Sequence, residues 1–227
     1  MEEKMFDRTL KIIEPELFLK IQKTKILLVG VGGVGGFAFE SLIRLGFTDI
    51  TLIDYDTFEK SNLNRQILCT EKTLNQIKIE CAKKRGESIN KKAHITLKNC
   101  FLNSENMSYI PEKYDYILDA CDTLTTKISL IKKAFKDNSK IISCMGTGNR
   151  LNPNFVEITT LNKTYNDPLA KKMRKLLKEE NMPLNIPVVW SKELPIKTKD
   201  RTPGSIFLVP ASAGLNLAYF VLEDLMN

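Results

Sequence analysis

Along the first two thirds of the chain, short apolar runs typical of buried strands alternate with segments whose apolar side chains recur at helical spacing. Residues 25–29 form a short apolar run, which predicts a buried strand, and residues 37–46 carry apolar side chains at helical spacing. The alternation continues, with strands predicted at residues 49–56, 94–99, 114–122 and 140–146 and helices at residues 73–90 and 124–137. Such β–α–β units make parallel strands that need covering on both faces. The pattern therefore predicts an α/β fold with a Rossmann-like, doubly wound and mostly parallel sheet.

The pattern changes in the last third of the chain. Residues 155–161 alternate between apolar and polar side chains, and residues 187–191 are apolar, so both segments predict strands. We expect these C-terminal strands to extend the sheet in antiparallel fashion. Between them, residues 167–180 predict a helix with Asp167 as its N-cap and Pro168 at its first position.

The segments that follow are less regular. Residues 181–203 hold four of the nine prolines, which predicts an extended excursion rather than a helix. Residues 205–210 form an apolar run that predicts a strand, and residues 211–226 predict a closing helix. That helix is apolar around most of its circumference, which is typical of burial in a core or in a subunit interface.

Length and composition are those of an ordinary globular protein. The 227 residues are 43% apolar and 27% charged, enough for one large domain over residues 1–227. We expect a nucleotide-binding half, residues 1–148, and a substrate and dimerisation half, residues 149–227. No run approaches eighteen apolar residues and the N-terminus lacks the apolar core of a signal peptide, so we expect no membrane segment and a cytoplasmic location.

The cysteine content and the net charge give limited information about the metals and partners that the protein binds. The five cysteines are widely spaced, which excludes a C-x-x-C zinc pair and makes free thiols in a reducing compartment the simplest interpretation. The net charge of +7 favours polyanionic partners such as nucleic acid.

A glycine-rich turn follows the first predicted strand. Gly30, Gly32, Gly33 and Gly35 satisfy the pattern G-x-G-x-x-G between an apolar strand and a helix. The first glycine permits the turn, the second lets backbone approach phosphate, and the third lets helix pack on strand. Asp54, at the end of the next strand, lies at the distance expected of a carboxylate that accepts ribose hydroxyls. The turn predicts nucleotide binding, and its plain structural alternative is a turn that only tightens packing.

The loop after that aspartate argues against a dehydrogenase. Asp56, Asn62, Asn64, Arg65 and Gln66 follow the second strand, at the carboxyl edge where open α/β folds bind ligands. A hydride-transfer enzyme needs an apolar slot for nicotinamide, whereas arginine and glutamine are suited to a triphosphate. ATP is therefore the predicted nucleotide, with a dehydrogenase and a non-catalytic nucleotide-sensing scaffold as the alternatives.

Several motifs resemble a known superfamily. The segments GVGGVGG, IDYD, NLNRQ, NQIKIECAK and DACD occur in the order and spacing of the ubiquitin-activating (E1-like) adenylating superfamily. Five others, FDRT, MGTGNRLNP, NDPLAKKMRKLLK, VVWSKELP and PGSIFLVPASAG, look like the branch that dehydrates N6-threonylcarbamoyladenosine in tRNA to its cyclic form.

The resemblance implies roles for individual residues. It implies that Asp54 holds the ribose, that Asn64, Arg65 and Lys78 contact the ATP phosphates, and that Asp122 coordinates Mg²⁺. Asn62 and Gln66 would complete the loop with hydrogen bonds. Arg8 would be an arginine finger that acts on the partner's ATP in a homodimer. The implied catalytic set is Arg8, Arg65, Lys78 and Asp122. Each residue also has a purely structural interpretation. Arg8 could be a surface arginine, Arg65 and Lys78 could be solvated charges, and Asp122 could be a helix N-cap.

Two substrates remain open. One is the threonyl carboxylate of the modified adenosine in tRNA, and the other is the C-terminal carboxylate of a ubiquitin-like sulfur-carrier protein. No cysteine follows Cys144 and no zinc tetrad is present, which favours the tRNA. The resemblance also allows a sulfur-transfer or cysteine desulfurase partner.

Two basic segments are candidates for tRNA contact, and either could equally be a solvated surface. One lies in a predicted helix and the other in the proline-rich excursion. The first consists of Lys171, Lys172, Arg174, Lys175 and Lys178, and the second of Lys192, Lys197, Lys199 and Arg201.

Overall fold

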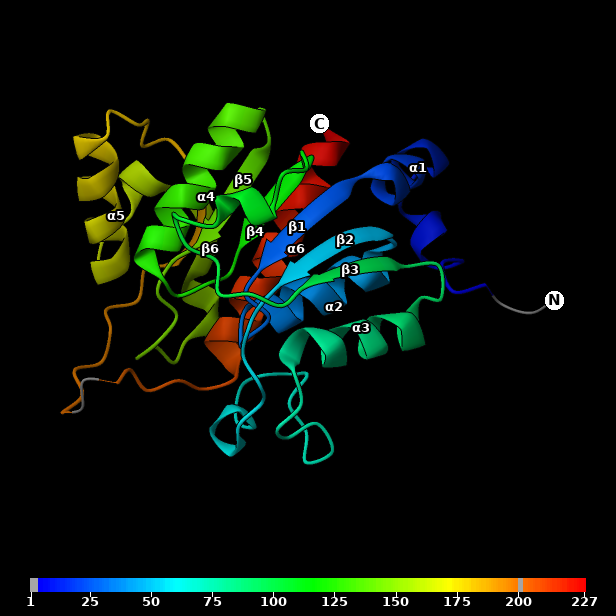
Figure 1. Cartoon of the computed structure of the whole chain (residues 1–227), viewed down its shortest axis with the longest axis horizontal. Helices are drawn as coiled ribbons and strands as arrows, with labels where there is room; N and C mark the ends of the chain where they lie inside the picture. Colours follow the sequence, from blue (N-terminus) through cyan, green and yellow to red (C-terminus); the bar gives the residue numbers. More distant parts are fainter. Residues whose placement is uncertain (1–3, 200–201) are drawn as a thin grey trace.

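Seven strands form one sheet in the order β3-β2-β1-β4-β5-β7-β6 (Figure 1). The computed structural model describes residues 4–199 and 202–227. The strands are β1 (Lys25–Val29), β2 (Asp49–Ile53), β3 (His94–Lys98), β4 (Tyr116–Asp119), β5 (Lys140–Cys144), β6 (Val156–Thr160) and β7 (Pro187–Ser191). Strands β1 to β5 and β7 run parallel, and β6 pairs antiparallel with β7. The expected antiparallel extension is thus the β6–β7 pair, with β7 continuing the parallel sheet.

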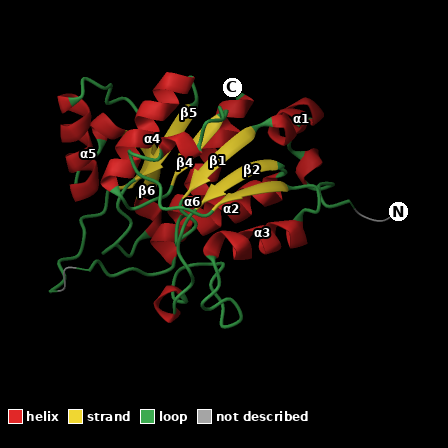
Figure 2. Ribbon diagram, in the orientation of Figure 1, coloured by secondary structure: helices red, strands yellow, loops and turns green. Residues whose placement is uncertain are grey.

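Helices lie on both faces of the sheet (Figure 2). The α-helices are α1 (Pro15–Lys23), α2 (Gly35–Leu45), α3 (Lys78–Ile89), α4 (Leu124–Asp137), α5 (Pro168–Glu179) and α6 (Leu208–Met226). Short 3₁₀ segments are Thr9–Lys11, Lys60–Asn62, Met107–Tyr109, Pro153–Phe155 and Leu161–Lys163. Within the described ranges, every helix is too short or too polar to cross a membrane.

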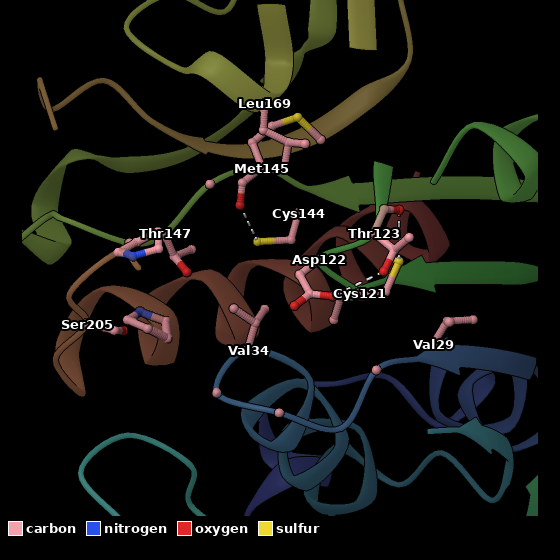
Figure 3. Close-up of a pocket in the computed structure, with 18 of the residues that line it drawn as sticks. Val29, Val34, Cys121, Asp122, Thr123, Cys144, Met145, Thr147, Leu169 and Ser205 are labelled. Carbon is pink, nitrogen blue, oxygen red and sulfur yellow. Dashed lines mark hydrogen bonds between the residues drawn. The ribbon is translucent and has the colours of Figure 1, made fainter. Parts of the chain in front are cut away.

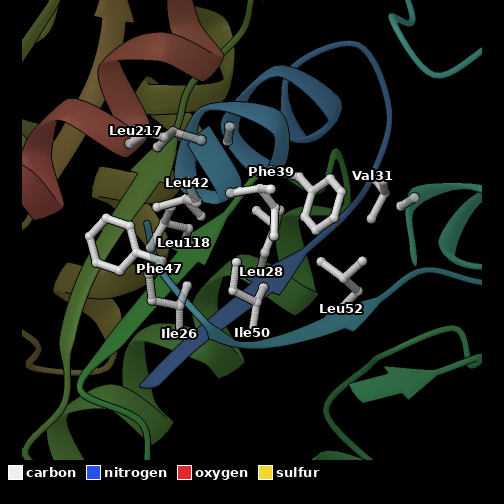
Figure 4. Close-up of a cluster of buried hydrophobic side chains, with 14 of the residues drawn as sticks. Ile26, Leu28, Val31, Phe39, Leu42, Phe47, Ile50, Leu52, Leu118 and Leu217 are labelled. Atoms are coloured by element: carbon white, nitrogen blue, oxygen red, sulfur yellow. The ribbon is translucent and has the colours of Figure 1, made fainter. Parts of the chain in front are cut away.

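Alternating side chains of the strands fill two separate cores. In β1, Ile26 and Leu28 face a core shared with α1, α2, α3 and α6, part of which is drawn in Figure 4. Leu27 and Val29 face the opposite core, shared with α4 and α5. All four are at most 3% exposed, so the strand is buried on both sides. This two-sided burial explains why the first strand is continuously apolar rather than alternating.

The direction of the sheet reverses between β1 and β4. From β1 the chain moves outward to β2 and then β3, and it returns to place β4 on the other side of β1. Ligands of open α/β sheets bind in the crevice at such a switch point, outside the carboxyl ends of the strands. The glycine-rich turn follows β1 and the segment DACD follows β4, so the topology brings both motifs to this crevice.

One predicted strand is wrong. Residues 205–210 are not a strand, because residues 205–207 are irregular and α6 already begins at Leu208. Pro210 lies in the first turn of α6, where its missing N–H has no intrahelical partner to lose. A short apolar run cannot by periodicity alone be distinguished from the start of a buried helix, which explains the error. The start of α5 is as predicted, since the Asp167 side chain accepts a hydrogen bond from the Ala170 N–H at 2.9 Å.

Glu40 of α2 is a buried carboxylate held by two arginines. Arg85 and Arg44 each donate two hydrogen bonds to it, at 2.7–3.0 Å. Burial alone would raise the pKa of Glu40, but the two guanidinium groups outweigh it and lower the pKa below its usual value of 4.5. A carboxylate whose pKa is lower in the folded state stabilises the fold above its unfolded-state pKa, and this contribution is lost as pH falls through the folded-state pKa.

We therefore expect Glu40→Gln to lower the free energy of unfolding by about 1 to 3 kcal/mol at pH 7. The difference from the parent protein should shrink as pH falls below about 4.5. Urea unfolding across this pH range measures both effects. Glu87→Gln, which removes an exposed i,i+4 partner of Lys83, is the matched control and should change stability by less than about 0.5 kcal/mol. A difference at Glu40 that is independent of pH would contradict the assignment.

Candidate functional site

A cavity of about 620 Å³ opens at the carboxyl ends of β1, β2, β4 and β5. Figure 3 shows Asp122, Thr147 and Ser205 around the open space, with Met145 and Leu169 on one side and Val34 on the other. The predicted site residues that line it are Gly30, Gly32, Gly33, Asp54, Asp56, Asn62, Arg65, Gln66, Lys78 and Asp122. The structure thus brings together most of the residues that the sequence singled out.

The glycine-rich turn has the geometry expected of a phosphate-binding turn. Gly30 has φ of 88°, and a Cβ there would lie 2.8 Å from the Ala120 carbonyl oxygen. A Cβ on Gly35 would lie 1.8 Å from the Gly30 carbonyl oxygen, so helix and turn pack too closely for any side chain. Because α2 begins at Gly35, its unpaired N–H groups and the positive end of its dipole face the cavity.

Asp54 ties the end of β2 to this turn. Its carboxylate accepts the Val31 N–H at 2.6 Å and the Asp56 N–H at 2.9 Å. Asp54 lines the cavity and is half-buried, so these two bonds orient its carboxylate toward the turn. A carboxylate oriented in this way is suited to accept hydroxyl groups of a ribose.

Lys78 is a buried cation at the first position of α3. Its side chain is 7% exposed, and its Nζ lies 2.9 Å from the Asp56 carboxylate, which is 45% exposed. The Lys78 N–H also donates to the Asp56 carbonyl oxygen at 3.0 Å. The pair therefore places a positive charge beside the glycine-rich turn, and Asp56 acts as the group that holds it. The sequence placed Asp56 in the site but gave no indication of this partner.

The segment 60–66 is folded by its own polar side chains. Asn62 completes a capping box with Glu59. Arg65 donates to the Ser61 carbonyl oxygen at 2.8 Å and to the Asn64 side chain at 3.0 Å. Gln66 is only 6% exposed, and its buried Oε1 has no hydrogen-bond partner among the described atoms. A buried acceptor without a hydrogen-bond partner lowers the stability of the fold, so a ligand that donates a hydrogen bond to Gln66 would remove this penalty.

Asn64 has a different neighbour from the one expected. Its Nδ2 donates to the Ser205 carbonyl oxygen at 2.9 Å, and Asn64 is not among the residues that line the cavity. Ser205 belongs to the segment before α6 and does line the cavity. Asn64 therefore joins the segment 60–66 to the segment that precedes α6.

Asp122 projects into the cavity without capping a helix. The N-cap of α4 is Thr123, and the Asp122 carboxylate accepts a hydrogen bond from the Thr123 hydroxyl at 3.3 Å. Within residues 4–199 and 202–227, no three histidine, cysteine, aspartate or glutamate side chains form a ready metal site. Mg²⁺ commonly uses one or two carboxylates together with substrate phosphates, which a single exposed aspartate beside a phosphate turn can satisfy.

A fully buried ion pair, which the sequence pattern did not predict, lies behind the cavity. Lys127 Nζ lies 3.0 Å from the Asp119 carboxylate and donates to the Cys144 carbonyl oxygen at 2.8 Å. Burial alone would lower the pKa of Lys127, but the Asp119 carboxylate raises it above its usual value. The pair bridges the carboxyl ends of β4 and β5. Its only sequence signal is a lysine on the apolar face of the helix at residues 124–137.

A second buried pair, Arg150 with Asp167, supports the opposite wall. Their side chains are 1% and 0% exposed and lie 3.3 Å apart. Arg150 also donates to the carbonyl oxygens of Gly146, Asn166 and Glu193. The motif MGTGNR contained this arginine, but nothing local indicated its burial.

The cavity thiols are poor nucleophiles. Burial raises the pKa of Cys100, raises that of Cys121 well above its usual value and raises that of Cys144 to about 12. Because the thiolate is the reactive form, none of the three is suited to form a thioester at neutral pH.

Some predicted residues lie away from the cavity. Arg8 is exposed beside the 3₁₀ segment Thr9–Lys11 and does not line the cavity of its own chain. Arg174 is half-buried and donates to the carbonyl oxygens of Leu161 and Thr164. Arg201 lies outside the described residues.

The doubly wound sheet, the glycine-rich turn and the cation-lined crevice define the class of Rossmann-like nucleotide-binding proteins. The chain belongs to the ThiF family, whose sequence model matches residues 6–184.

Individual relatives match over nearly the whole chain. A Bacillus subtilis protein named tRNA threonylcarbamoyladenosine dehydratase is 31% identical over 240 residues, covering 98% of this chain and 94% of that protein. Two crystal structures of the E. coli tRNA N6-threonylcarbamoyladenosine dehydratase, one in complex with AMP and one with ATP, each superpose with a TM-score of 0.92 at 29% identity. They cover 98% of this chain and 94% and 93% of theirs.

Proposed function

We propose that this protein catalyses the ATP-dependent dehydration of N6-threonylcarbamoyladenosine in tRNA to its cyclic form. The observation that carries the proposal is the cavity at the sheet switch point, where the glycine-rich turn meets Lys78, Arg65 and Asp122. It lies in a fold that matches the ATP-complexed E. coli dehydratase along almost its entire length. The protein is thus an ATP-dependent adenylating enzyme that acts on a carboxylate.

The chemistry explains why cations line the cavity. The threonyl carboxylate attacks the α-phosphorus of ATP, pyrophosphate leaves, and an acyl-adenylate forms. An oxygen of the carbamoyl group then attacks the activated carbonyl and the ring closes. AMP leaves with the carboxylate oxygen that had attacked phosphorus, and a carbamoyl N–H proton is released. Carboxylate and triphosphate repel each other, so positive groups must cancel that repulsion before they can react. Because the attacking oxygen lies in the same molecule, ring closure needs no enzymic nucleophile, in agreement with the protonated cavity thiols.

The residues have separate tasks in this proposal. Arg65 and Lys78 neutralise the phosphates, Asp54 orients the ribose, and Gln66 and Asn62 hold the loop that carries Arg65. Asn64 ties that loop to the segment before α6. It can contact phosphate only if its side chain gives up the hydrogen bond to Ser205 and binds the ligand instead. Asp122 would hold Mg²⁺ together with phosphate oxygens, and the ion would supply charge neutralisation on the triphosphate.

A homodimer is part of the proposal. Exposed apolar side chains recur along one side of α6 at helical spacing, namely Leu208, Leu215, Tyr219 and Met226, which are 46–54% exposed. A stripe of this kind favours coverage by a second copy. The partner would then bring Arg8 to a cavity that this chain's own Arg8 does not reach. A sulfur-transfer or cysteine desulfurase partner and a cytoplasmic location remain predictions.

Nucleoside mass spectrometry tests the function. Incubation of the protein with ATP, Mg²⁺ and tRNA that carries the modification should convert the modified nucleoside to a product lighter by one water. Omission of ATP, or tRNA without the modification, gives the matched controls. An unchanged nucleoside, together with adenylation of a small protein ending in Gly-Gly, would instead assign the protein to the sulfur-carrier activators.

A further inference from the structure

The connection between β7 and α6, described over residues 192–199 and 202–207, forms part of the cavity wall. Pro195 lines the cavity where the connection leaves the sheet, and Pro203 and Ser205 line it where the connection returns. Figure 1 shows this connection in orange, looping out near the end of the molecule that also carries residues 60–66 in cyan. The excursion predicted from the prolines is therefore an element of the site.

Two residues of the β5–β6 loop anchor the connection at both ends. The Asn149 carbonyl oxygen accepts the Ile196 N–H at 2.8 Å, and the Asn149 N–H donates to the Gly204 carbonyl oxygen at 2.7 Å. The Asn149 side chain accepts the Gly204 N–H at 2.6 Å. Arg150 reaches the Glu193 carbonyl oxygen at 3.2 Å from its buried pair with Asp167. These bonds hold both ends of the connection at the rim.

The connection carries two lysines between its anchors. Lys197 and Lys199 are exposed, and neither makes an ion pair with another described residue. Lys197 and Lys199 follow Pro195 by two and four residues, so their Cα atoms lie within about 7 Å and 14 Å of its Cα. Lys192, a further positive charge among the described residues of this segment, is paired with Glu157 at 3.3 Å. Two positive charges without an ion-pair partner among the described residues therefore stand near the cavity opening.

The basic helix α5 is a weaker candidate for the same role. Only its first turn, Pro168 and Leu169, reaches the cavity, and the helix packs beside α4. Arg174 is used in internal hydrogen bonds, and Lys175 faces Glu179 at 3.8 Å. Part of the charge on α5 is thus already compensated.

We propose that Lys197 and Lys199 bind backbone phosphates of the tRNA next to the modified nucleoside. The inference rests on the proposed function and specifies the surface that such a substrate would use. The modified nucleoside must enter a cavity bounded by this connection, so the flanking phosphates must pass over its rim. Lysines act on phosphate as point charges and contribute affinity independently of sequence. Asn149 and Arg150 are positioning residues that keep the two lysines at the opening.

The test compares two double variants with the same change in charge. Lys197→Ala with Lys199→Ala should raise the KM for modified tRNA about 10-fold and reduce the dependence of log affinity on log salt by about 1.5 to 2. The kcat at saturating tRNA and the KM for ATP should not change. The double Lys→Arg variant should restore tRNA affinity. Lys171→Ala with Lys172→Ala on α5 is the control and should change the KM for tRNA less than about 2-fold.

Other results of this experiment would contradict either the inference or the proposed function. Loss of tRNA affinity in the α5 variant but not in the connection variant would move the contact to α5 and overturn the inference. Unchanged tRNA affinity in both would also overturn it. If the parent protein leaves the modified nucleoside unaltered, the proposed function itself fails. The inference about Lys197 and Lys199 fails separately, when the parent protein is active and the variants bind tRNA as tightly as it does.

Discussion

Replacing Lys78 with methionine is expected to lower pyrophosphate release from ATP by at least about 10³-fold. Lys78 places a buried positive charge in the cavity wall, where the proposed reaction needs charge on the ATP phosphates to be neutralised. Asp56, which loses its partner, is 45% exposed and can be solvated, so the free energy of unfolding should fall by only about 1 kcal/mol or less. Substrate-dependent pyrophosphate release and thermal unfolding measure the two effects.

The control for Lys78 lies on the same helix. Lys84→Met removes one exposed lysine from α3 and should leave pyrophosphate release unchanged. A Lys78→Met protein that keeps full activity would show that the phosphates lie elsewhere. A loss of activity accompanied by unfolding would be resolved by Lys78→Arg, which keeps the charge and should retain more activity than methionine.

Replacing Arg8 with alanine is expected to lower turnover by about 10³-fold or more while leaving ATP affinity and stability nearly unchanged. Arg8 is exposed and outside its own chain's cavity, so its proposed action requires the second subunit. Lys11→Ala, at the end of the 3₁₀ segment that Arg8 precedes, is the matched control and should be nearly fully active.

Mixed dimers identify which subunit supplies Arg8. After random exchange between Arg8→Ala and Lys78→Met chains, half of the dimers are mixed, and each holds one cavity with its own Lys78 and a partner's Arg8. Activity should then recover to about a quarter of the parent value. No recovery would mean that Arg8 acts within its own chain, and a fully active Arg8→Ala homodimer would make it a surface arginine.

The glycine-rich turn and the start of α5 could be predicted because they depend on near neighbours. Gly30 is required by its positive φ, and Gly35 by the Gly30 carbonyl oxygen five residues before it. Asp167 and Pro168 start α5 through bonds spanning three residues. In both cases the residue type and its place in the local pattern were sufficient.

The buried ion pairs could not be predicted in the same way. Arg150 and Asp167 lie on different elements, and only the packing of α5 against the β5–β6 loop makes them buried partners. Residues 205–210 were assigned to a strand because an apolar run does not reveal whether its neighbours are strands or helices. In the folded protein that run leads into α6, which packs on α2.

The sequence by itself determined the alternation of strands and helices, the glycine-rich turn and the charged groups that follow the strands. These features follow from periodicity and from turn chemistry, which act over a few residues. Only the tertiary structure decided that Lys78 is held by Asp56, 22 residues away, and that Asn64 joins Ser205 across 141 residues. Such contacts depend on the order of strands in the sheet, because that order decides which loops share one edge and which charges are removed from water there.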